Sequence, residues 1–344
     1  MSARSSRHGS RIATDSDGPR EVRRVDVARS AGVSQSTVSY VLRGTPGVSI
    51  TPATRRRVLE AAEKLGYAPH FSASSLASGK TDIVGLLLPS QDYQFQIYYS
   101  DMVQGIIQEA DHTPYFFLYL GQDQVDKYRR CFSRKYLDGA VIIQSRYDDF
   151  HIRALQDYGV PMVTVDYVNS AGCPSVTMDY EAAVDAAYAY MASRGRRAIA
   201  LVCSDRGLQP NRRHLKRHHE LCKLYGAGIR FANVDYEKVQ ASGFRLGAYL
   251  DREPWDGFVV DGGVRGRLIA EHCRSRGKKV GVDFDLCVLC TGDRNVEMPS
   301  GVLVLEASGR ELGRQAWKTM EQMLEGRASE CGNTVLPFLS TRSE

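Results

Sequence analysis

Four polar side chains stand at positions that share one face of a predicted helix: Gln35, Ser36, Ser39 and Tyr40. Amide and hydroxyl groups donate and accept hydrogen bonds, so such a face can meet the edges of base pairs. The sequence contains no Gly-x-Ser-x-Gly, P-loop or His-Glu-x-x-His element, the signatures of several hydrolases and nucleotide-binding proteins. We therefore expect a binding surface here, and we expect no catalytic residues, no cofactor and no bound metal.

The residues around this face predict two helices joined by a tight turn. Gly32 can adopt the left-handed backbone of the turn, and Ser34 is a good N-cap for the second helix. Seven apolar residues would pack the corner: Val27, Ala28, Ala31, Val33, Val38, Val41 and Leu42. This is the layout of a helix-turn-helix, whose second helix enters the major groove with its N-terminus first.

A third helix is predicted after Thr51, which would cap it, and Pro52, which suits its first position. Its predicted inner face is formed by Val58, Leu59, Ala62 and Leu65. Arg55, Arg56 and Arg57 fall in the first turns, where they could meet phosphate. The alternative interpretation is an ordinary three-helix bundle with a charged surface.

The positive charge of the chain is concentrated near its N-terminus. Residues 1–80 hold 13 Lys and Arg against 6 Asp and Glu, a net charge of +7. Residues 81–344 hold the other 32 Lys and Arg against 34 Asp and Glu, a net charge of −2. A local basic field suits a polyanionic partner such as double-stranded DNA, although a solvated basic tail would have the same composition.

Composition divides the chain into four predicted parts. Residues 1–20 have almost no apolar side chains and are expected to be a disordered tail. Residues 21–67 form the headpiece, residues 68–80 a small and polar linker, and residues 81–344 a core.

The core alternates short apolar runs with amphipathic stretches. Strands are predicted over 82–88, 114–120, 139–144, 161–166, 198–203, 257–261 and 285–290, and helices over 98–111, 179–195, 211–225 and 264–276.

This alternation predicts an all-α headpiece joined to a two-lobed α/β core with mostly parallel, doubly wound sheets. No apolar run reaches ~18 residues, so we expect no membrane span. The N-terminal residues carry no apolar segment of the secretory type. The eight cysteines have no framework spacing, which favours reduced thiols and a cytoplasmic location.

Several runs of the sequence resemble the LacI/GalR (lactose-repressor) family. The similarity is strong over residues 25–89, in DVARSAGVSQSTVSYVL, TRRRVLEAAEKLGYAP and SSLASGKTDIVGLLLP, and continues more weakly through SVTMDYEAAVDAAYAYMASRGRRAIALV (175–202) and DGFVVDGG (256–263). The resemblance implies a core like that of periplasmic sugar-binding proteins. It further implies a homodimer that binds a pseudo-palindromic operator at the nucleoid, by default as a repressor. The final residues, 334–344, resemble the family's closing strand and carry no leucine heptad, so we expect no tetramerising tail.

The resemblance assigns base contacts to Gln35, Ser36 and Tyr40, and phosphate contacts suit Thr37 and Ser39. Ser34, Thr51 and Arg55 complete the predicted headpiece contacts. Two departures from the family stand out. Most relatives carry Arg where this chain has Tyr40, which puts the common guanine contact in doubt. The loop over residues 44–50 is also about two residues longer than usual.

A short hinge helix is implied within the linker, over residues 72–79. So short a helix is marginal in water, and in the family it folds when two copies meet in the minor groove. Leu76 stands at the position of the leucine that opens the central base step, and Ala73 is one of the small residues that would let two hinge helices approach. The alternative is a flexible linker with Leu76 packed on the core.

The resemblance also locates an effector site, and this chain departs from it at most positions. Asp166 matches the family's first polar contact. At four other positions the usual polar residue is replaced: His214 stands for Arg, Asp261-Gly262 for Asn-Asp, Gly292 for Asp and Ala307 for Gln. A hexose needs several buried polar partners, so we expect a different small-molecule effector or none. The aromatic group Tyr93, Phe95, Tyr98 and Tyr99 either lines the site or belongs to the core or a dimer interface.

Two metal-like patterns are discounted. His214, His218 and Cys222 share one face of a predicted helix, which is more simply a polar surface. Cys287 and Cys290 have CxxC spacing in a predicted strand, where their side chains point to opposite faces. The competing classes are a solute-binding protein, which should lack a headpiece, and an enzyme, for which no constellation is present. Activator and repressor are not distinguished by these residues.

Overall fold

The computed structural model describes residues 22–43, 47–67, 75, 79–89, 97–143, 150–203, 216–217, 220–221, 230–235, 250–251, 253–291 and 296–342. The chain divides into two compact units, Met1–Gly79 and Lys80–Glu344. Each unit is described by itself. Among the described residues, no helix combines the length and the apolar character needed to cross a bilayer.

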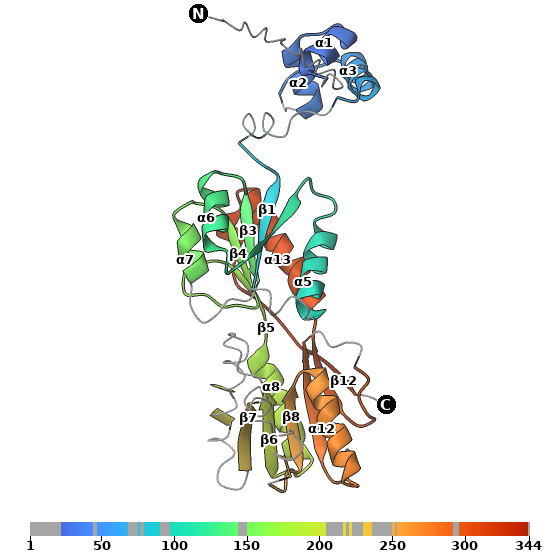
Figure 1. The fold of residues 1–344 in the computed structure, drawn as a ribbon, viewed down its shortest axis with the longest axis vertical. Coiled ribbons are helices and arrows are strands. Elements are labelled where there is room, and N and C mark those ends of the chain that lie inside the picture. Colours follow the sequence, from blue (N-terminus) through green and yellow to red (C-terminus); the bar gives the residue numbers. More distant parts are fainter. Residues whose placement is uncertain are drawn as a thin grey trace, which may run out of the picture. The chain divides into compact units, whose positions relative to one another are not determined.

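In the first unit, the helices α1 (Arg24–Ala31), α2 (Gln35–Arg43) and α3 (Pro52–Leu65) pack around one apolar cluster (Figure 1). The buried members of the cluster are Val27, Ala28, Ala31, Val38, Val41, Val58, Ala61 and Ala62. The predicted place of Leu59 in this cluster is wrong, because its side chain is 47% exposed. Successive helical residues lie about 100° apart, so the stripe through Val58, Ala61 and Leu65 turns Leu59 to solvent.

The second unit contains two six-stranded sheets. The first sheet has the strand order β11-β5-β4-β3-β1-β2. Its strands are β1 (Ile83–Leu88), β2 (Phe116–Gly121), β3 (Gly139–Ile143), β4 (Met162–Val165), β5 (Ser175–Met178) and β11 (Thr334–Leu336). All neighbours in this sheet pair in parallel, and β1 pairs with β2 from Ile83↔Phe116 to Leu88↔Gly121.

Helices cover both faces of the first sheet (Figure 1). On one face, α5 (Ile97–Glu109) and α13 (Gly309–Leu324) pack on Val84, Val141 and Val163. On the other face, α6 (Val125–Ser133) and α7 (Phe150–Gln156) pack on Leu87, Ala140 and Ile142. Burial on both faces explains why these strands are continuous apolar runs in the sequence.

The second sheet has the order β12-β10-β9-β8-β6-β7. Its strands are β6 (Ala198–Cys203), β7 (Arg230–Asp235), β8 (Gly257–Asp261), β9 (Asp285–Thr291), β10 (Leu303–Ala307) and β12 (Leu339–Arg342). The pairs are parallel except that β12 runs antiparallel to β10. Helix α8 (Tyr180–Ser193) covers one face and α12 (Gly263–Ser275) covers the other, and a short 3-10 turn, Ala328–Glu330, follows α13.

Three connections pass between the two lobes that these sheets define. The chain leaves the first sheet after β5 to form α8, returns after β10 to form α13, and crosses again between β11 and β12. This arrangement confirms the predicted two-lobed, doubly wound α/β core. The predicted strands are all present, and β5, β7, β10, β11 and β12 are added to them. The predicted helix over 211–225 lies mostly outside the described residues, although residues 216–217 and 220–221 are helical.

The close approach of α5 and α13 depends on glycines. A Cβ at Gly105 would lie 2.1 Å from the carbonyl oxygen of Arg310, and a Cβ at Gly313 would lie 2.0 Å from that of Met102. Each distance is far below van der Waals contact, and each atom met is backbone, which cannot rotate away. The two helices can therefore pack at this distance only without side chains at these positions.

We predict that Gly313→Ala lowers the free energy of unfolding by about 1–3 kcal/mol, because the added methyl forces the two helices apart. Chemical denaturation of the full chain measures this loss. The matched control is Gly332→Ala, where a Cβ would meet no atom within 4 Å, and it should change stability by less than about 0.5 kcal/mol. Equal stabilities of the two variants would contradict the packing described.

Candidate nucleic-acid interface

The corner between α1 and α2 is fixed by backbone geometry. Gly32 ends α1 with φ 64°, and the amide of Val33 donates to the carbonyl of Ala28 at 3.0 Å. A left-handed residue at this position strains any side chain with a Cβ, which explains the glycine. Ser34 then caps α2, because its Oγ accepts from the amide of Thr37 at 3.1 Å. The predicted turn and cap are both present.

Helix α2 has one buried face and one accessible face. Val38 and Val41 are buried in the cluster, whereas Gln35 and Ser36 are exposed and Tyr40 is 41% exposed. Ser39 lies at the margin and is partly buried. The three side chains predicted to contact bases therefore lie together on the exposed side of α2, beginning at its N-terminus. A helix N-terminus with free donors also favours an approach to anionic phosphate.

Three of the predicted phosphate contacts form hydrogen bonds within the headpiece. The Thr37 hydroxyl lies 2.9 Å from the Ser34 Oγ, so it also belongs to the cap. Thr51 caps α3 by accepting from the amide of Thr54 at 3.2 Å. Arg55 donates to the carbonyl of Val41 at 3.5 Å, a long hydrogen bond at the C-terminus of α2. These hydrogen bonds fix both ends of α2 and the start of α3.

Arg56 and Arg57 are exposed on α3, and the Arg56 guanidinium lies 3.9 Å from Glu60. An exposed pair at this distance contributes little, so the guanidinium can exchange to another anion at low cost. The positive charge predicted for this unit is therefore accessible.

The predicted hinge contacts fall on residues that lie outside the described part of the chain, namely Ala73 and Leu76. Next to them, the amide of Gly79 donates to the carbonyl of Ser75 at 2.8 Å, the i to i+4 spacing of a helical turn. Gly79 itself has φ 70°, which suits the end of a helix.

Some of the predicted effector residues lie outside the described part of the chain, and others lie within it. His214 and Gly292 lie outside the described residues, as does the side chain of Tyr98, and Tyr99 next to it is buried in the core of the first lobe. Asp166 follows β4 with φ 53° and is 1% exposed. Asp261 ends β8, and its carboxylate lies 3.5 Å from the Arg265 guanidinium.

Asp166 has a partner, Tyr180, that no motif in the sequence indicates. The hydroxyl of Tyr180, the first residue of α8, donates to the Asp166 carboxylate, with its oxygen 2.7 and 2.6 Å from the two carboxylate oxygens. Tyr180 is 1% exposed and packs edge-to-face on Phe338, which lies between β11 and β12. No local sequence pattern predicts this contact, because the two residues meet only after the chain has passed through β5.

The discounted cysteine pair behaves as predicted. Cys287 packs in the cluster on the α8 face of the second sheet, and Cys290 packs in the cluster on the α12 face. Burial raises the pKa of the Cys287 thiol, which disfavours the thiolate that a metal requires. Across the described residues there is no group of three or more side chains that could hold a metal ion.

Known bacterial regulators are similar to this chain in sequence and in fold. The family model described as "Bacterial regulatory proteins, lacI family" matches residues 25–70. Catabolite control protein A of Priestia megaterium is 36% identical over 52% of this chain and 53% of its own length, so the match spans about half of each. The HTH-type transcriptional regulator pepR1 of Lactobacillus delbrueckii subsp. lactis is 25% identical over 91% of this chain and 94% of its own length.

Among solved structures, the lac repressor dimer bound to operator and the anti-inducer ONPF matches with a TM-score of 0.76 at 21% identity. That match covers 94% of this chain and 99% of the other, and it concerns the fold. Residues 25–70 therefore match the lacI family of bacterial regulatory proteins, and the chain as a whole shares the fold of the lac repressor.

Proposed function

We propose that this regulator binds a pseudo-palindromic DNA operator as a homodimer and represses transcription by occupying it. The observation that carries the proposal is the accessible side of α2, where Gln35, Ser36 and Tyr40 lie together while Val38 and Val41 are buried. A capped helix that keeps polar groups outward at its N-terminus has the geometry for the major groove. Because its proposed partner is chromosomal DNA, we place its action in the cytoplasm, at the nucleoid. We propose no catalytic activity for it.

The side chains of α2 differ in what they can recognise. The Gln35 amide can form paired hydrogen bonds with adenine, and the Ser36 hydroxyl can donate or accept at any base edge. The Tyr40 ring can contact a thymine methyl group, where an arginine would prefer guanine. Ser34, Thr37, Ser39, Thr51 and Arg55 are assigned to the backbone of the duplex, which sets register rather than sequence.

Two copies are needed because one headpiece of this size makes few contacts. When two headpieces are joined through their cores, binding of the second becomes intramolecular and overall affinity rises steeply. The linker supports this arrangement through its hinge segment, for which we propose that Ala73 permits close approach and Leu76 enters the minor groove. The lac repressor structure that matches this fold is itself a dimer bound to its operator.

We further propose that the core does not respond to a common hexose. The carboxylate of Asp166 already accepts from Tyr180, and that of Asp261 lies beside Arg265. A sugar hydroxyl would have to displace these internal partners, and each displaced buried polar group is costly. His214 and Tyr98 remain candidates for contacting another small-molecule effector.

The proposed function is tested by selecting duplexes from a random DNA pool with the full chain. The expected product is a pair of inverted half-sites. If a dimer contacts roughly 6–10 phosphates, its affinity should fall about 10³–10⁵-fold between about 50 and 200 mM salt. Failure to enrich any duplex at low ionic strength, together with a monomeric state in solution, would overturn the proposal.

For the hinge, we predict that Leu76→Ala loses at least about tenfold in affinity for the selected duplex, because the apolar wedge is removed. Salt-sensitive binding to unrelated DNA should persist. Leu339→Ala is the matched control, since Leu339 is exposed on β12 in the other unit. A mobility-shift titration measures both variants, and unchanged operator affinity of Leu76→Ala would refute the wedge.

For the core, calorimetric titration of the full chain with common hexoses should give no heat of binding. The reason is the internal pairing of Asp166 and the missing polar partners at the other positions. Binding of a hexose at micromolar concentration would show that the site is functional in its usual form.

A further inference from the structure

Strand β2 stands at one end of the first sheet and exposes large apolar side chains. It pairs with β1 on one side, and in the described part of the chain no strand pairs with its other side. Phe116 is 69% exposed, Leu118 is 39% exposed and Tyr119 is 57% exposed. No other described strand of the two sheets exposes three large apolar side chains. We call Phe116, Leu118 and Tyr119 the β2 edge patch.

The β2 edge patch reaches both faces of the first sheet, because side chains alternate along a strand. Phe117 packs edge-to-face on Trp317 of α13, with ring centroids 5.3 Å apart, and Tyr119 points to the same face. Leu120 is buried on the face covered by α6 and α7, to which the other two members of the patch also point. The helices therefore leave an apolar surface open along the edge of the sheet.

The sequence of β2 contains none of the usual protection of a sheet edge. Proteins that remain monomeric protect such edges with charged residues, with proline or with a bulge. β2 (Phe116–Gly121) contains no charged residue and no proline, and all six of its residues pair in register with β1. An edge with open backbone groups and exposed apolar side chains is a place where another chain binds.

The absence of charge on β2 favours a second copy of this chain over a different partner. At a two-fold axis, residues near the axis meet their own copies, so a charge there would face a like charge. The β2 edge patch avoids this repulsion. It also offers no charge by which a different protein could be selected. A neutral apolar edge is therefore suited to contact with itself.

The size of the β2 edge patch fits the centre of an interface. A whole aromatic side chain offers about 150–250 Å², so the exposed parts of the three side chains amount to roughly 300 Å² in each copy. A standard interface buries about 800 Å² on each partner and has an apolar centre with a polar rim. The patch supplies such a centre, and neighbouring elements would supply the rim.

We propose that the β2 edge patch is the apolar centre of the contact between the two cores of the homodimer. The exposed side chains of β2 in two copies pack against each other across a two-fold axis at this edge of the first sheet. This inference rests on the proposed dimeric function and names the surface that joins the copies. The contact lies wholly within the second unit, so it should form in the absence of DNA.

The test compares full-length variants that each lose one exposed apolar side chain. Phe116→Ser should raise the dissociation constant of the dimer about tenfold or more, because an aromatic side chain is lost from the interface in both copies. Sedimentation over a dilution series measures this constant. Binding of the variant to a duplex with a single half-site should stay unchanged.

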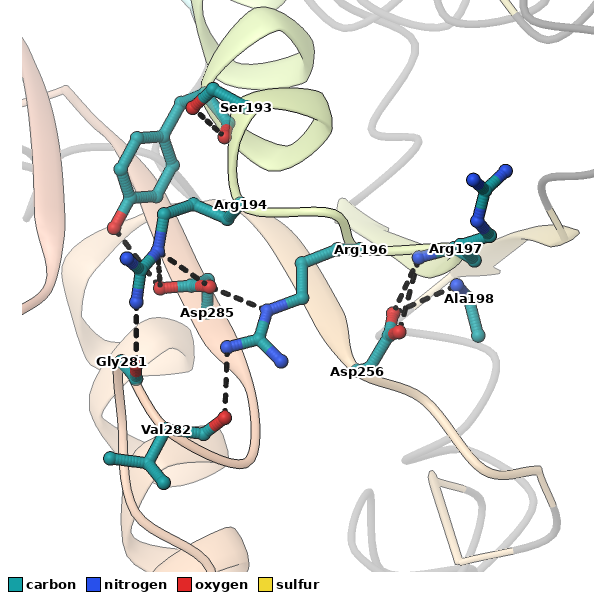
Figure 2. Close-up of polar contacts among 10 residues, drawn as sticks. Ser193, Arg194, Arg196, Arg197, Ala198, Asp256, Gly281, Val282 and Asp285 are labelled. Carbon is teal, nitrogen blue, oxygen red and sulfur yellow. Dashed lines mark hydrogen bonds and ion pairs between the residues drawn. The ribbon is translucent and has the colours of Figure 1, made fainter.

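Val282→Ser is the matched control, since Val282 is also 69% exposed but lies in the second lobe. Figure 2 shows its loop held by polar contacts: the carbonyl of Val282 accepts from Arg196 at 3.1 Å, and that of Gly281 accepts from Arg194. The substitution should therefore leave both this loop and the dissociation constant of the dimer unchanged. Melting temperature is recorded for both variants.

Two results would overturn the inference: an unchanged dissociation constant in Phe116→Ser, or an equal rise in Val282→Ser. If Phe116→Ser does not fold, Tyr119→Ser must weaken the dimer in the same direction. A wild-type dimer that is insensitive to these substitutions would remove this surface and leave the dimeric function standing. A wild-type chain that stays monomeric at micromolar concentration would instead contradict the dimeric function itself.

Discussion

The packing of Val38 and Val41 against α1 and α3 is the constraint on which the DNA-binding surface depends. Burying these two residues fixes the rotation of α2 about its own axis. Gly32 and Ser34 then fix where α2 begins and in which direction it runs. Once rotation and start are set, Gln35, Ser36 and Tyr40 have only one direction left, toward solvent. The orientation of this surface is therefore decided by apolar residues that are buried away from it.

In the core, polar contacts between residues far apart in the sequence hold the backbone just before the first strand of each lobe. In each lobe the carboxylate of one aspartate, Asp138 or Asp256, accepts hydrogen bonds from backbone at the start of the lobe's first strand, β1 or β6. The Tyr180 hydroxyl on Asp166 adds a contact at the first crossing between the lobes. The Tyr180 contact satisfies the Asp166 carboxylate within the protein, which supports our proposal that the core does not respond to a common hexose.

Much of the fold was predicted from local sequence patterns. The cap at Ser34, the turn at Gly32 and the apolar runs of β1, β3 and β8 are all set by neighbours in sequence, and the structure has each of them. The errors and omissions arise where spacing alone is ambiguous or where partners are distant. Leu59 is apolar and adjacent to Val58, yet only the geometry of three packed helices turns it outward. The contact between Tyr180 and Asp166 joins residues 14 positions apart, and that between Thr81 and Asp138 joins residues 57 apart, which no local pattern specifies.

In our proposal, the accessible side of α2 lies in the major groove at two related half-sites. A base-resolution footprint of the full chain on its selected duplex measures this most directly, by protection of purine N7 atoms in the major groove. We expect two protected clusters related by two-fold symmetry and centred about 10–10.5 base pairs apart or at a multiple of that distance. Protection limited to the sugar-phosphate backbone, or a single cluster without a symmetric partner, would contradict it.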